Sequence, residues 1–86
     1  MRNIYGQIDG NQVIADEMIL YGQICGDVVV ESGGVLVVNG HVCGRVHVKG
    51  NGTVEVAGMV TGIISQDDGA TVSILPGAIV LNPENE

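Results

Sequence analysis

Two cysteines and a histidine are the residues of this chain whose types and spacing come closest to a reactive or metal-binding site. Cys25 and Cys43 stand eighteen positions apart, and His41 precedes the second cysteine by two positions. Thiolate and imidazole groups are preferred ligands of zinc when several of them converge. Cys25, Cys43 and His41 are therefore the candidate metal ligands, provided that the fold brings them to one face.

Duplication of a repeat is the simpler explanation of the two cysteines. Both occupy the same position of a repeated unit, which is what copying that unit leaves behind. We also expect no disulfide, because in-register parallel side chains point alike even where the Cα spacing permits a bridge. The sequence therefore predicts no metal site and no bound cofactor.

The two histidines, His41 and His47, are the natural candidates for general-base catalysis. The sequence pattern gives neither of them a Ser or Cys nucleophile together with an orienting carboxylate. Glu55 is expected on another face, and a flat outer wall would offer no pocket for a substrate. We therefore expect no catalytic residues and no enzymatic activity.

An eighteen-residue repeat must position all of these side chains. Gly22-Gln-Ile-Cys-Gly26 recurs as Gly40-His-Val-Cys-Gly44 and as Gly58-Met-Val-Thr-Gly62, and the residues that follow each copy stay aligned. A copy that is two residues shorter begins at Gly6. A fixed period near twenty residues is typical of a solenoid, in which each repeat stacks on the one before it.

Strand alternation assigns the inside of this solenoid. Odd positions of the unit hold the aliphatic residues that we expect to face inward, and the interleaved glycines mark corners with no space for a side chain. The inward columns are Ile24, Val42 and Val60; Val28, Val46 and Ile64; Val30 and Val48; Leu36, Val54 and Val72; and Val38, Val56 and Ile74. In the short first copy, Gln12 is expected where Val28 and Val46 stand later.

The predicted fold is all-β: a single-stranded, triangular, parallel β-helix, or β-solenoid, of about five coils of 18 residues. We expect one domain over residues 1–86, with an N-terminal lead-in or cap at 1–5, coils over 6–81 and an acidic tail at 82–86.

Short Gly-x-Val-x-Gly units, the Gly26-Asp-Val-Val-Val30 run and the Leu75-Pro-Gly-Ala-Ile-Val80 segment together resemble the bactofilins. The resemblance covers residues 6–80. Bactofilins are bacterial cytoskeletal proteins that form polymers from a right-handed, triangular β-helix. The resemblance therefore implies a right-handed coil and a structural, self-associating role.

A left-handed coil is the alternative. Aliphatic residues also recur every six positions from Ile24 to Val60, as in hexapeptide-repeat acyltransferases and gamma-class carbonic anhydrases. The small residue that should follow each of these positions is irregular here. The residues found there include Cys25, Glu31, Val37 and Lys49. The resemblance to the bactofilins implies a right-handed coil, and the rule that parallel crossovers are right-handed agrees with it, so we expect a right-handed coil.

Charge and composition limit the partners of the chain. Its 86 residues include ten acidic and three basic side chains, which gives a formal net charge of −7. Phosphate contacts need Lys and Arg, so a basic protein is a more plausible partner than nucleic acid. No apolar run approaches a membrane span and no signal-peptide pattern opens the chain, so we expect a cytoplasmic protein without a transmembrane segment.

Two functions remain open. One is a structural scaffold that associates with itself as a homo-oligomer or polymer, in a bactofilin-like cytoskeletal or assembly role. The other is an acidic binding module that docks on or neutralises a basic protein, for example as a toxin-immunity protein. For self-association we predict a lateral patch, because outward positions of the N-terminal half are aliphatic where later coils are polar. The patch residues are Val13, Ile19, Val29, Val35 and Val37.

Overall fold

The computed structural model describes residues 2–83, with side chains described as far as residue 80. These residues form thirteen short strands, and no helix among them is long and apolar enough to cross a membrane. The strands are β1 (Arg2–Ile4), β2 (Gln7–Asp9), β3 (Gln12–Ile14), β4 (Glu17–Leu20), β5 (Gln23–Cys25), β6 (Val28–Val30), β7 (Val35–Val38), β8 (His41–Val42), β9 (Val46–Val48), β10 (Thr53–Val56), β11 (Met59–Gln66), β12 (Thr71–Ile74) and β13 (Ile79–Pro83).

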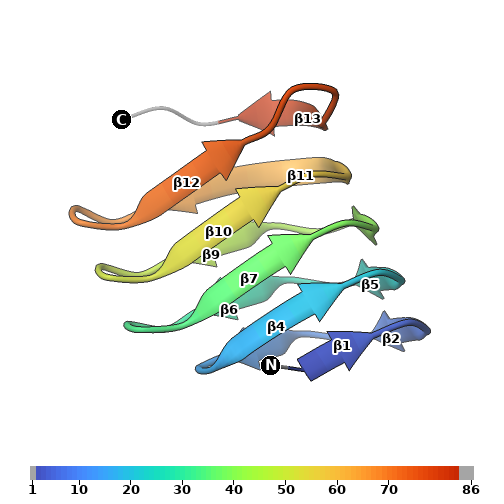
Figure 1. Ribbon diagram of the computed structural model, residues 1–86, viewed down its shortest axis with the longest axis horizontal. Coiled ribbons are helices and arrows are strands. Elements are labelled where there is room, and N and C mark those ends of the chain that lie inside the picture. The colour runs from blue at the N-terminus through green and yellow to red at the C-terminus, as the bar shows by residue number, and fades with distance from the viewer. Residues whose placement is uncertain (1, 84–86) are drawn as a thin grey trace.

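The strands stack in three parallel columns, which are the faces of a triangular β-solenoid. Face A contains β1, β4, β7, β10 and β12 in that order. Face B contains β2, β5, β8 and the first parts of β11 and β13, whereas face C contains β3, β6, β9 and the last parts of β11 and β13. Figure 1 shows face A in front and the chain returning behind it as it climbs, so the coil is right-handed.

The described residues make four complete coils, with β1 and β13 as parts of a further coil at either end. The repeat spacing is kept between coils, since Val54 is the register partner of both Leu36 and Val72. The short first copy pairs Gln12 with Val28 as predicted. Its missing residues fall at the corner after β3, because the offset is sixteen residues up to Ile14 and eighteen from β4 onward.

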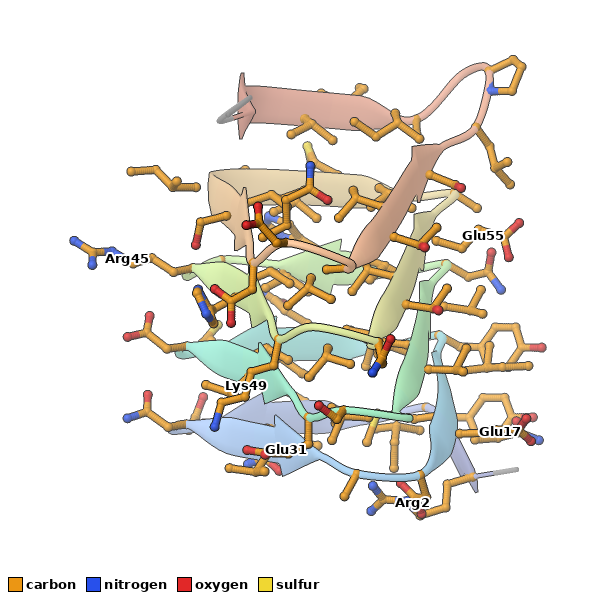
Figure 2. All side chains as sticks on the ribbon, turned by 90° about the vertical axis from the view of Figure 1, so that its left-hand side faces the viewer. Arg2, Glu17, Glu31, Arg45, Lys49 and Glu55 are labelled. Atoms are coloured by element: carbon orange, nitrogen blue, oxygen red, sulfur yellow. The ribbon has the colours of Figure 1, made fainter. Side chains whose placement is uncertain are left out.

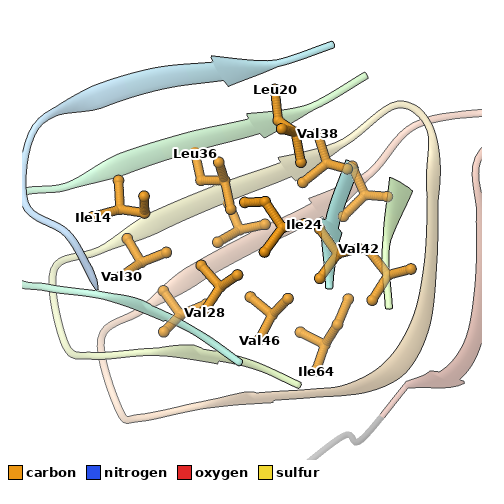
Figure 3. Packing of buried hydrophobic residues seen from close by; sticks show 14 of the residues in the cluster. Ile14, Leu20, Ile24, Val28, Val30, Leu36, Val38, Val42, Val46 and Ile64 are labelled. Atoms are coloured by element: carbon orange, nitrogen blue, oxygen red, sulfur yellow. The ribbon is translucent and has the colours of Figure 1, made fainter. Parts of the chain in front are cut away.

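The inward columns form the core of the solenoid (Figure 3). Fifteen apolar side chains of the described chain are buried, and no polar one is. They are Ile14, Met18, Leu20, Ile24, Val28, Val30, Leu36, Val38, Val42, Val46, Val48, Val54, Val56, Val60 and Ile64. The alternation that the sequence predicts is thus confirmed for the inner coils, while Val72 and Ile74 of the last coil are not fully buried.

The corner glycines are required because successive coils approach closely there. A Cβ atom on Gly40 would collide with the carbonyl oxygen of Gly22, and one on Gly44 would collide with that of Gly26. The obstructing atoms belong to the backbone, so they cannot move aside as a flexible side chain would. The expectation that these corners leave no space for a side chain is confirmed.

The N-terminal lead-in is itself a strand. β1 pairs with β4 in parallel, and Ile4 packs against the core. Tyr5 is exposed instead of covering the core, and its ring stacks on Tyr21 with centroids 5.0 Å apart and an interplanar angle of 6°. The predicted acidic tail at 82–86 lies outside the residues whose side chains are described.

Candidate functional site

The outer wall of face B brings the two cysteines together. Cys25 ends β5 and Cys43 follows β8, where its N–H donates to the carbonyl of Ile24 at 2.9 Å. The two sulfur atoms lie 3.2 Å apart, and both residues are partly buried free thiols. Parallel alignment therefore does not keep the two sulfurs apart. Coils are only about 4.8 Å apart, so a rotation about each Cα–Cβ bond lets the sulfurs converge.

Gln23 holds this pair from the neighbouring outward position. Its Nε2 donates to Cys43 Sγ at 3.0 Å and contacts Cys25 Sγ at 3.3 Å. The hydrogen bond with Cys43 raises the pKa of the Cys25 thiol, and desolvation and the charges of Cys43 and Asp9 raise it further, against a lowering by Gln23. Cys25 therefore keeps its proton at neutral pH and shares it with the facing sulfur.

His41 lies on the same face but does not complete a set of metal ligands. Within residues 2–83, no group of three His, Cys, Asp or Glu side chains is placed to hold a metal ion. Register places His41 between Gln23 and Met59, and its Nε2 is buried there with no hydrogen-bond partner in the described chain. The structure thus brings together two of the three candidate ligands.

His47 has two side-chain partners that sequence reasoning missed. On face C, its Nδ1 lies 2.9 Å from Ser65 Oγ and its Nε2 lies 3.2 Å from Asp67 Oδ1. A serine and a carboxylate thus lie on either side of this histidine ring. Ser65 occupies the same repeat position one coil later, so stacking the repeats could have found it.

This His47 cluster is a contact between coils and not a hydrolase triad. In a serine-hydrolase triad the serine faces Nε2 and the carboxylate faces Nδ1, whereas His47 shows the reverse arrangement. The side chains of His47 and Asp67 are also about half exposed, so water screens their interaction. We interpret the cluster as a pair of polar contacts that fixes the register of the third and fourth coils.

Charged side chains make similar contacts between other coils. Lys49 Nζ lies 3.3 Å from Glu31 Oε2, whereas the guanidinium of Arg45 projects away from the wall (Figure 2). Arg2 pairs with Asp16 at 2.8 Å. Exposed pairs of this kind contribute about 0.2–1 kcal/mol, so they set register more than they stabilise the fold.

The predicted lateral patch is divided between two faces. Val13 and Val29 lie on face C, whereas Ile19, Val35 and Val37 lie on face A. Val13 is 61% exposed, and the other four are partly buried. The patch is therefore a pair of smaller apolar surfaces that meet across a corner of the solenoid.

The largest departure from the predicted core lies at the C-terminal end of face A. Among the described strands β12 is the last of its sheet, and Ile74 is 47% exposed although its direction continues an inward column. The N–H groups of Thr71 and Leu75 donate to the carbonyls of Gly52 and Val56, at the two ends of β10. Because alternate residues of a parallel strand bond to opposite sides, the N–H groups of Val72 and Ile74 point to the free edge.

Comparison with known proteins gives no relative from which to transfer a function. No family model, curated protein or solved structure matches the chain.

Proposed function

We propose that the protein is a structural scaffold whose copies associate with one another, in a bactofilin-like assembly role. The observation that carries the proposal is the 47% exposure of Ile74 at the open end of face A. Leu20, Val38 and Val56 occupy the same column in the earlier coils, and all three are fully buried. A further strand over β12 would bury Ile74 in the same way.

A second copy supplies what this end lacks. Burying an aliphatic side chain contributes about 1.5–3 kcal/mol relative to leaving it exposed. Leu75, the next residue along the chain, is also exposed and would enlarge the apolar contact. The free N–H and C=O groups of β12 are in addition a template for pairing with another strand. Both contributions favour association through the end of the solenoid.

The symmetry of the contact between copies decides whether they form an open polymer or a closed dimer. If the C-terminal end of one copy met the N-terminal end of the next, the contact would repeat and produce an open polymer. If two C-terminal ends met, the contact would close as a dimer. The lateral patch, with Val13 as its most exposed member, is the second contact surface and would join solenoids side by side.

Light scattering over a concentration series tests self-association. We expect the molar mass of the wild-type protein to rise with concentration and that of Ile74→Thr to rise much less. Val35→Thr combined with Val37→Thr tests the lateral patch separately. Ser73→Thr is the matched control, because it changes the neighbouring side chain of β12 without touching the inward column. A wild-type protein that stays monomeric at every concentration would refute the proposal.

The distribution of charge favours docking on a basic protein as a second candidate function. Two of the three basic side chains, Arg2 and Lys49, are already paired with acidic groups of the same chain. The exposed carboxylates of Asp9, Asp27 and Asp68 therefore add to a net negative surface. A persistent monomer that binds a basic protein tightly and in a salt-dependent manner would favour this candidate.

A further inference from the structure

The geometry of face B points to a chemical role that is independent of self-association. We propose that Cys25 and Cys43 are a modification site, a dithiol across two coils that closes into an intramolecular disulfide by exchange with a low-molecular-weight disulfide such as oxidised glutathione.

The positions of the two cysteines meet the requirements of a disulfide. Neighbouring parallel strands are about 4.8 Å apart, which lies within the Cα separation of about 4.4–6.8 Å found in disulfides. The sulfur atoms already face each other at 3.2 Å. Closing the bond therefore needs side-chain rotation and a short approach, without a change in the register of the coils.

One neighbour of the sulfurs, Gln23, assists the exchange. Both thiols are partly accessible, and the Gln23 amide donates to both sulfurs, so it stabilises the negative charge that develops on either one. Repeat alignment places Asp9 one coil before Cys25 and Thr61 one coil after Cys43. The column thus holds two adjacent sulfurs and no third, so the pair can form just one bridge.

The exchange proceeds in two steps. One cysteine thiolate attacks a sulfur of the small disulfide, which forms a mixed disulfide and releases one small thiolate. The second cysteine, after losing its proton to solvent, attacks the protein sulfur of the mixed disulfide. The Cys25–Cys43 bond forms and the second small thiolate leaves. Two electrons pass from the protein dithiol to the small disulfide, which is reduced to two thiols.

The bridge joins the second coil to the third. Stability in a solenoid is close to a sum over repeats and the interfaces between neighbours, so one covalent tie strengthens a single interface. It also closes a short loop in the unfolded chain, from residue 25 to residue 43, and so lowers the entropy of the unfolded state. The oxidised protein should therefore melt at least about 5 °C above the reduced protein.

Equilibration of the full chain in mixtures of reduced and oxidised glutathione tests the site. After acid quenching and alkylation of the remaining thiols, intact mass should show wild-type protein with no free thiol, no glutathione adduct and two hydrogens fewer. The oxidised fraction should not depend on protein concentration. Cys25→Thr and Cys43→Thr introduce threonine, which the chain already has at this repeat position as Thr61, and each should stop as a single mixed disulfide.

Wild-type protein that accumulates glutathione adducts, or that forms disulfides only between copies, would overturn the proposal. The same conclusion follows if the melting temperature does not differ between the oxidised and the reduced protein. Because the wild-type measurements decide by themselves, the test stays valid if a threonine variant fails to fold. Cys25→Ser is then the replacement control, because it keeps the size of the side chain.

Discussion

Ile74 is the register partner of Val56 on the neighbouring strand, yet Val56 is fully buried and Ile74 is 47% exposed. Both are aliphatic and both continue the same inward column. They differ in that Val56 lies between two strands of face A, whereas Ile74 lies on the last one. The exposure of Ile74 is therefore a consequence of where stacking ends.

Gly40→Ala tests the close approach of coils at the corners. The added methyl group would collide with the Gly22 carbonyl, so we expect a loss of about 2–4 kcal/mol or a failure to fold. Gly6→Ala is the matched control, because Gly6 holds the same repeat position and no atom lies within 4 Å of its added Cβ. Urea denaturation of the two variants should separate them clearly; equal stabilities would contradict the assigned packing.

Val54→Asp tests the assignment of inside and outside on β10. The carboxylate would be buried with no partner, so the variant should be unfolded or lose at least about 3 kcal/mol. Thr53→Asp places the same group on the outward side of the same strand, and its melting temperature should stay near that of the wild type. Circular dichroism melts of both variants check the prediction, which is wrong if Val54→Asp melts normally.

The inner fold was predictable because strand alternation and an eighteen-residue period leave few alternatives. Val28 and Val46, for example, fall in one buried column whichever residue is taken as the start of the repeat. The end of the solenoid was less predictable, since the position of Ile74 in the unit says nothing about whether another coil follows. A repeat alignment predicts that Cys25 and Cys43 stack in one outward column. The distance between their sulfur atoms also depends on the side-chain rotamers, which the alignment does not predict.

The reduced protein should become less stable in alkaline solution because of Cys25. The fold raises the pKa of this thiol above that of the unfolded chain, chiefly through the hydrogen bond with Cys43. Its contribution to stability is therefore present at neutral pH and is lost as the pH rises through the folded-state pKa. Thermal melts with a reductant between about pH 7 and pH 11 should show a steeper decline for the wild type than for Cys25→Thr. Parallel declines would contradict the pKa shift.

His41→Met should stabilise the protein. The Nε2 atom of His41 is buried without a hydrogen-bond partner in the described chain, and such an atom costs about 1–3 kcal/mol of desolvation. Methionine already occupies this repeat position one coil later, as Met59, so a methionine side chain fits at this position of face B. We expect the free energy of unfolding, measured in urea, to rise by about 1 kcal/mol; a clear fall would show that His41 has a partner after all.

Backbone amide exchange at the free edge of β12 tests the proposed end contact most directly. Exchange rates of the Val72 and Ile74 amides are measured in dilute and in concentrated protein, with the Thr53 amide as an internal reference because it is bonded to Gly34 inside face A. If copies meet at this end, concentration slows exchange at Val72 and Ile74 and leaves Thr53 unchanged, and Ile74→Thr abolishes the difference. If the molar mass rises while exchange at Val72 and Ile74 stays fast, the copies associate through another surface and the end contact is wrong.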